Sequence, residues 1–128
     1  MRRILAVDDD PDTTLTVKVG LEGSRSSSSS NGIFEVDTFN DPELALSSFK
    51  PDIYDLVLLD FRMPKMDGYE LYDKIKNIDS RVKVCFLSAT YVNYEAAREV
   101  FPSLEMECFI QKPIEIKDLI RRINAELK

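Results

Sequence analysis

Histidine and tryptophan are absent from this 128-residue sequence, which contains only two cysteines and four glycines. Without histidine, the chain can supply neither a serine–histidine–aspartate triad nor a histidine ligand for a metal. The two cysteines, Cys85 and Cys108, lie inside apolar runs and not in a metal-binding spacing. We therefore expect both to be small, buried, apolar side chains that stay reduced.

The sequence also lacks any apolar run as long as a membrane span, which needs about 20 residues. Its first residues do not form a signal peptide, because Met1, Arg2 and Arg3 lead directly into a strand-like run. We therefore expect a cytoplasmic protein that does not enter a membrane.

The chain has fewer basic than acidic residues: 17 lysines and arginines against 23 aspartates and glutamates, which gives a net charge of −6. Proteins that bind nucleic acid usually carry a basic surface that neutralises the bound phosphates. The acidic balance argues against direct binding of nucleic acid by this chain.

The composition is otherwise that of an ordinary globular domain, with 44% hydrophobic and 31% charged residues. A compact domain of this length buries roughly two thirds of the surface of its unfolded chain. We expect one domain over residues 1–128, with no output domain. A serine-rich tract at residues 23–32 is too small and polar to pack, and it is typical of a loop inserted between a helix and a strand.

The most informative stretch is residues 56–71, LVLLDFRMPKMDGYEL. Four apolar residues end in a carboxylate, Asp60, and the turn-forming pair Asp67-Gly68 follows. A short apolar run between polar boundaries is typical of a strand buried on both faces of a parallel sheet. Open α/β sheets bind their ligands at the carboxyl ends of such strands. Asp60 is therefore a candidate nucleophile for a phosphoryl group.

Strand and helix patterns alternate along the whole chain. Apolar runs predict strands at residues 3–7, 33–39, 56–59, 82–87 and 108–110. Helical patterns follow at residues 11–22, 42–49, 68–78, 94–100 and 116–127. This order predicts a parallel sheet with helices on both faces and right-handed crossovers.

Polar side chains follow most of the predicted strands. Asp8 and Asp9 come after the first strand, Asp60 after the third, Ser88 at the end of the fourth and Lys112 after the fifth. Singly, these residues have ordinary interpretations: acidic residues cap helices, a serine closes a turn, and a lysine is exposed. In a doubly wound sheet, however, the strand ends converge on one crevice.

Three carboxylates in one crevice need a cation. Two carboxylates about 4 Å apart repel by roughly 4 kcal/mol at an effective dielectric constant of about 20. A hard divalent ion with oxygen ligands, Mg²⁺, suits this donor set. Lys112 would add positive charge and Ser88 a hydrogen bond to a phosphoryl group that Asp60 attacks in line.

The segments ILAVDDDP, LVLLDFRMPKMDGYEL, FLSA and FIQKP occur together in this order and spacing. On these segments the chain resembles, over essentially its whole length, the receiver domains of two-component response regulators, the CheY-like family. The resemblance implies a flavodoxin-like (βα)5 fold with strand order 2-1-3-4-5. It also implies that Asp60 takes a phosphoryl group from the phosphohistidine of a sensor histidine kinase or phosphotransfer protein. The chain would then catalyse only its own phosphotransfer and dephosphorylation.

The resemblance further implies the roles of the residues around Asp60. Asp9, Asp60 and the backbone carbonyl of Arg62 would bind Mg²⁺, with Asp8 assisting through water. Ser88 and Lys112 would contact the phosphoryl group, and the bond between Lys112 and Pro113 would be cis.

Receivers of this family switch between two states, as the serine or threonine moves toward the phosphoryl group and an aromatic residue turns inward. That aromatic residue is here Phe109, where many members of the family have tyrosine. Because phenylalanine has no hydroxyl group, Phe109 can signal the change of state by becoming buried, but not by forming a new hydrogen bond with a partner. The surface that changes would be residues 94–127, which would bind a downstream protein or a second copy of the chain.

Three other interpretations remain open at this point. Residues 10–14, DPDTT, match the D-x-D-x-T pattern of aspartate-nucleophile phosphatases, although they begin two residues after the carboxylate that follows the first strand. A flavin-binding module of similar fold would need a phosphate loop rich in serine, threonine and glycine after the first strand, which the sequence lacks. A pseudo-receiver that acts only by interaction is disfavoured by the complete set of residues at the strand ends.

Overall fold

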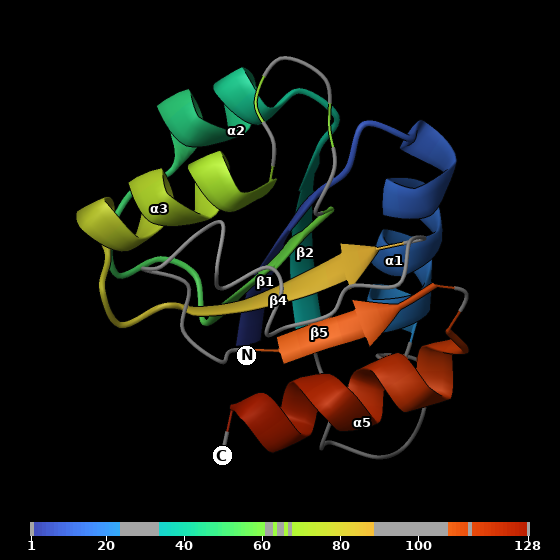
Figure 1. The fold of residues 1–128 in the computed structure, drawn as a ribbon. Coiled ribbons are helices and arrows are strands. Elements are labelled where there is room, and N and C mark those ends of the chain that lie inside the picture. Colours follow the sequence, from blue (N-terminus) through green and yellow to red (C-terminus); the bar gives the residue numbers. More distant parts are fainter. Residues whose placement is uncertain are drawn as a thin grey trace.

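The computed structural model of the chain describes residues 2–23, 34–60, 63, 66, 68–88, 108–112 and 114–127. This part contains five strands and four helices (Figure 1). The elements are β1 (Arg2–Val7), α1 (Pro11–Gly23), β2 (Phe34–Phe39), α2 (Pro42–Ser48), β3 (Leu56–Leu59), α3 (Gly68–Ile78), β4 (Lys83–Ser88), β5 (Cys108–Gln111) and α5 (Ile116–Glu126). The predicted helix at residues 94–100 and most of the serine-rich tract lie outside the described residues.

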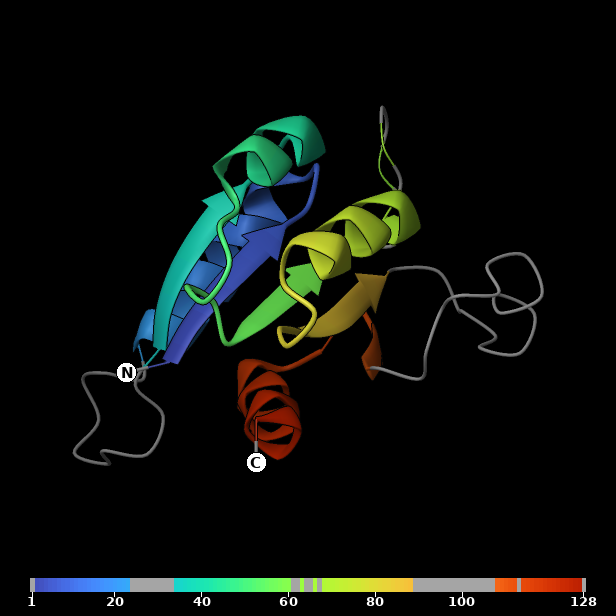
Figure 2. The same ribbon diagram turned by 90° about the vertical axis from the view of Figure 1, so that its left-hand side faces the viewer.

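The five strands form one parallel sheet in the order β2-β1-β3-β4-β5, which confirms the predicted fold. Figures 1 and 2 show helices on both sides of this sheet. Buried residues of α1 and α5 pack with one face of the strands, and buried residues of α2 and α3 pack with the other. The carboxyl ends of all five strands therefore lie along one edge.

The apolar run of β3 is explained by its central place in the sheet. All four of its residues are buried, with Leu56 and Leu58 in the α1–α5 core and Val57 and Leu59 in the α2–α3 core. A strand covered on both faces has no position for a polar side chain, so polarity returns only at Asp60, where the strand ends. Cys85 of β4 is likewise fully buried, as predicted, whereas the side chain of Cys108 lies outside the description.

The helices begin and pack largely as the sequence predicts. Asp10 caps α1, because its carboxylate accepts hydrogen bonds from the amide of Asp12 at 3.0 Å and the hydroxyl of Thr13 at 3.3 Å. In α5 the predicted apolar stripe faces the core. In α3 the apolar residues Leu71 and Ile75 are fully buried, whereas Ile78, the last residue of the helix, is 41% exposed.

Gly20 allows α1 and α5 to approach closely. A Cβ atom at this position would overlap the side chain of Ile116, the first residue of α5. Any larger residue at position 20 would therefore push against the start of α5, which follows directly on the segment that carries Lys112.

A buried carboxylate, Asp79, holds two turns together at the amino ends of the strands. It accepts hydrogen bonds from the amides of Asp52 and Arg81, each at 3.0 Å, and is 7% exposed. Asp52 itself has a φ of 64°, a conformation that only glycine, asparagine and aspartate adopt readily. The hydrogen bond from the Asp52 amide, and then the one from Arg81, lower the pKa of Asp79 below its ordinary 3.8, against the opposing effect of burial.

Replacing Asp79 by asparagine is expected to lower the free energy of unfolding by about 2 kcal/mol at neutral pH, because one of the two amides then faces an NH2 group and the other keeps only a neutral acceptor. The pKa of Asp79 is lower in the folded state, so its contribution is present above the ordinary carboxyl pKa and is lost as the pH falls through the folded value. The difference from wild type should therefore shrink in acid. Urea denaturation at several pH values measures this.

The exposed Asp73 of α3 offers a matched control. Its replacement by asparagine should change the free energy of unfolding by less than about 0.5 kcal/mol. Equal stability of the two variants at neutral pH would contradict the role given to Asp79.

Candidate functional site

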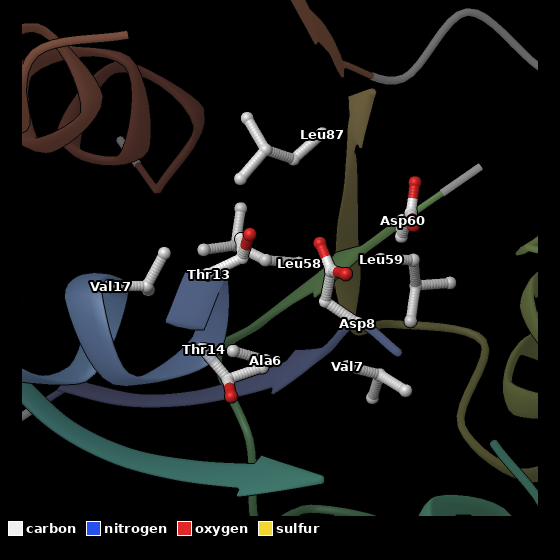
Figure 3. A pocket seen from close by; sticks show the side chains of 10 residues that line it. All are labelled: Ala6, Val7, Asp8, Thr13, Thr14, Val17, Leu58, Leu59, Asp60 and Leu87. Atoms are coloured by element: carbon white, nitrogen blue, oxygen red, sulfur yellow. The ribbon is translucent and has the colours of Figure 1, made fainter. Parts of the chain in front are cut away.

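Two aspartates are held at the carboxyl edge of the sheet by main-chain hydrogen bonds that continue the strand pairing. The amide of Asp8, just after β1, donates to the carbonyl of Phe39 at 3.2 Å. The amide of Asp60, just after β3, donates to the carbonyl of Val7 at 2.9 Å. Because β1 and β3 are adjacent, the two side chains lie side by side beyond the strand ends (Figure 3).

Asp8, Asp9 and Asp60 form one acidic group. Each offers a carboxylate oxygen within 4.8 Å of the others, and Asp8 is buried, Asp60 half-buried and Asp9 exposed. At this separation and an effective dielectric constant of about 20, each pair of charges repels by roughly 3 to 4 kcal/mol. The group therefore favours a cation, and its all-oxygen donors are those preferred by a hard divalent ion.

Lys112 reaches this acidic group from the end of β5. Its Nζ lies 2.6 Å from Oδ2 of Asp8, across 104 residues of sequence. The side chains of Lys112 and Asp8 are only 20% and 6% exposed, so water screens this ion pair weakly. The sequence predicts Lys112 at this site as a partner of a phosphoryl group, but it does not predict the contact with Asp8.

Both carboxylate oxygens and the main-chain carbonyl oxygen of Asp8 accept hydrogen bonds. Besides Oδ2, which pairs with Lys112, its Oδ1 accepts a hydrogen bond from the amide of Asp10 at 2.9 Å. The side-chain amide of Asn40 donates to the carbonyl of Asp8 at 2.8 Å and to the hydroxyl of Thr14 at 2.9 Å. Asn40 thus ties the β1–α1 turn to the end of β2, a contact that no pattern in the sequence indicates.

The remaining predicted site residues are described only in part. Ser88 ends β4 opposite Gln111 of β5, but its side chain lies outside the description. Phe109 of β5 is half-buried and stacks on Phe86, with ring centroids 5.1 Å apart and planes at 20°. Arg62 and Pro113 lie outside the described residues, so the predicted carbonyl ligand and the predicted cis bond stay predictions.

A cavity beneath the two strand-end aspartates is very small. It has a volume of about 10 Å³ and is lined by residues of β1, α1, β3 and β4, with Asp8 and Asp60 at its rim (Figure 3). This is room for about one water molecule and not for an organic substrate. The cavity therefore cannot hold an organic ligand beneath the two aspartates, and it does not limit what binds above them at the sheet edge.

The geometry also bears on the phosphatase motif DPDTT at residues 10–14. Asp10 does not end a strand, since its carboxylate caps α1. The position directly after the first strand, where such phosphatases have their nucleophile, is held by Asp8, which forms an ion pair with Lys112.

None of the helices that the structure describes has the length and the apolar character of a membrane span.

The chain matches the family model "Response regulator receiver domain" over residues 4–124. It is similar to the transcriptional regulatory protein PrrA of Mycobacterium tuberculosis, with 31% identity over 128 residues, and to the CpxR homolog of Haemophilus influenzae, with 34% identity over 130 residues. These matches cover 98% and 100% of this chain but 50% and 51% of the relatives. The chain thus spans about half the length of these curated relatives.

Solved structures of receiver domains have the same fold. A CheY-like receiver domain protein from Methanospirillum hungatei superposes with a TM-score of 0.81 at 24% identity, covering 99% of this chain and 94% of that one. The non-phosphorylated HemR receiver domain from Leptospira biflexa superposes with a TM-score of 0.80 at 26% identity, covering 100% and 95%.

Proposed function

The chain belongs to the response regulator receiver domain family, and on that premise we propose that Asp60 is its phosphoryl acceptor. The observation that carries the proposal is the convergence of Asp8, Asp9, Asp60 and Lys112 at one edge of the sheet. Among the described residues, these three carboxylates have one ammonium group close by, so they keep an excess of negative charge. Such a site is prepared for a metal ion and for a group whose charge that ion can neutralise.

The donor set fits Mg²⁺, the ion expected from the sequence. Asp9 and Asp60, with the backbone carbonyl of Arg62, would hold the ion, and Asp8, whose two oxygens each accept a hydrogen bond, would reach it through water. When bound, Mg²⁺ would neutralise charge on the phosphoryl oxygens.

In the proposed reaction a carboxylate oxygen of Asp60 attacks the phosphorus of a phosphohistidine on a sensor histidine kinase or phosphotransfer protein. The bond between phosphorus and the imidazole nitrogen breaks, and its electron pair stays on that nitrogen. The donor histidine must come from the partner, since this chain has none. Lys112 would turn from Asp8 toward the new phosphoryl oxygens, and Ser88 would donate a hydrogen bond to them.

The resulting change would be read by a partner protein. Lys112 directly follows β5, and β5 carries Phe109, whose ring packs against Phe86 of β4. Movement of Lys112 and Ser88 therefore acts on the two strands whose aromatic rings stack. The surface proposed to change is residues 94–127, and its proposed partner is a downstream protein or a second copy of the chain.

Removing Mg²⁺ is expected to block phosphorylation by a small phosphodonor. Incubation of the protein with acetyl phosphate and Mg²⁺ should add one phosphoryl group, seen as a single mass increase in intact-protein mass spectrometry. Excess EDTA should abolish that increase. Without the metal, the negative charge of the three clustered carboxylates repels the anionic phosphodonor, and nothing neutralises that repulsion.

Labelling that persists in excess EDTA would remove the metal from the proposal. A folded protein that takes no phosphoryl group even with Mg²⁺ would instead favour the pseudo-receiver alternative. Turnover of a simple phosphate ester would revive the phosphatase alternative.

A further inference from the structure

Two side chains of α1 form hydrogen bonds with the main-chain N–H and carbonyl of Val36 in β2. Lys18 Nζ donates to the carbonyl oxygen of Val36 at 2.7 Å, and the amide of Val36 donates to Glu22 Oε2 at 2.8 Å. Lys18 and Glu22 also pair with each other, with 3.0 Å between Nζ and Oε2. A strand residue thus has both of its main-chain groups bonded to side chains and not to a neighbouring strand.

These groups of Val36 point away from the sheet. β2 is the terminal strand, with β1 as its neighbour on one side (Figure 2). The carbonyl of Phe39 accepts from Asp8, which follows β1, so the main-chain groups of Phe39 face β1. Because these groups alternate in direction along a strand, Phe34, Val36 and Thr38 present theirs on the open side.

Among the described residues, no further strand pairs with the open side of β2, which is a surface that an identical strand would fit. Two copies of β2 running antiparallel, with Val36 opposite Val36, would place Phe34 of each opposite Thr38 of the other, so all outward-facing groups would meet. Such pairing is two-fold symmetric and closes into a dimer. Exposed strand edges are the usual route to this kind of association.

We propose that Lys18 and Glu22 close the outer edge of β2 and keep it from pairing with β2 of a second copy of the chain. Val36 is the central one of the three outward-facing residues, and its main-chain groups are already hydrogen-bonded to Lys18 and Glu22. Only Phe34 and Thr38, four residues apart, could then pair with another strand. A ladder cannot run through the occupied residue. Both side chains reach this edge from α1 through their hydrogen bonds to Val36, and they are 42% and 23% exposed.

The test is the double variant Lys18→Ala and Glu22→Ala. It removes one positive and one negative charge, so the net charge stays at −6, and alanine preserves the helix. We expect the variant to dimerise with rising concentration in sedimentation velocity without phosphodonor, whereas wild type stays monomeric. Replacing the exposed residues Glu70 and Lys74 of α3 by alanine makes the same change of charge away from β2 and should leave the protein monomeric.

A third substitution separates edge pairing from general adhesion. Thr38→Pro removes an outward-facing N–H without affecting the groups that face β1. Added to the double variant, it should restore the monomer. A folded double variant that stays monomeric, or a triple variant that still dimerises, would overturn the proposal.

Hydrogen exchange in the wild-type protein gives an answer even if the double variant does not fold. The amides of Val36 and Thr38 both face the open side, but only that of Val36 is bonded to Glu22 among the hydrogen bonds described. After correction for intrinsic rates, Val36 should exchange more slowly by roughly tenfold or more. Equal protection of the two amides would overturn the closing role of Glu22.

Discussion

Asp60→Asn is expected to abolish labelling by acetyl phosphate and Mg²⁺ completely. The carboxamide is a poor nucleophile, and the substitution also removes one of the three oxygen donors at the strand ends. The variant should remain folded, because it removes one member of a group of three repelling charges. We expect its free energy of unfolding without Mg²⁺ to rise by about 1 kcal/mol. Intact-protein mass spectrometry and urea denaturation measure the two effects.

Asp10→Asn is the matched control for this variant. Asp10 lies close by in the sequence and begins the phosphatase-like motif, but its carboxylate caps α1, and asparagine caps a helix as well as aspartate does. This control should be labelled like wild type. Equal labelling of the two variants would contradict the assignment of Asp60, and loss of labelling in Asp10→Asn alone would favour the phosphatase motif.

Lys112→Met is expected to lower the free energy of unfolding by about 2 to 3 kcal/mol at neutral pH. The substitution leaves the buried carboxylate of Asp8 without its counter-charge, beside two further carboxylates. Methionine keeps most of the length and the apolar stem of the side chain, so the loss is mainly electrostatic. Urea denaturation with an unchanged m-value would show that only stability has changed.

The chain offers an exposed lysine as the control for Lys112. Lys117 Nζ lies 3.5 Å from Oε2 of Glu115, and both side chains are 73% exposed. Lys117→Met should therefore lower the free energy of unfolding by less than about 0.5 kcal/mol. A second substitution, Asp8→Asn, should recover most of the stability lost in Lys112→Met, because it removes the uncompensated charge. Failure of that rescue would mean that Lys112 contributes by packing and not by its charge.

The features that the sequence predicts are those that depend on local pattern and on the order of elements. β3 is apolar throughout because both of its faces are covered, so the carboxylate after it is conspicuous. The alternation of strands and helices places all strand ends at one edge, which is enough to bring Asp8, Asp60 and Lys112 together. Asp10 caps α1 from the position directly before Pro11, where an acidic residue is a common cap, so this role too depends on local pattern.

The features that the sequence does not predict depend on contacts between distant residues. Asn40 reaches Asp8 across 32 residues, and Glu22 reaches Val36 across 14, and neither contact has a spacing that a periodic pattern could show. In α1 the sequence offers two apolar pairs of equal spacing. Only Val17 and Leu21 are buried, while Leu15 and Val19 are 59% and 61% exposed. The helix packs on one face of the sheet, and only tertiary structure decides which pair faces it.

Chemical trapping of the phosphorylated residue tests the central claim most directly. Borohydride reduces an acyl phosphate to an alcohol, so a phosphorylated aspartate becomes homoserine, which peptide mass spectrometry can locate. After treatment of the wild-type protein with acetyl phosphate and Mg²⁺, homoserine is expected at position 60. Homoserine at position 8, 9 or 10 in place of position 60 would contradict the account.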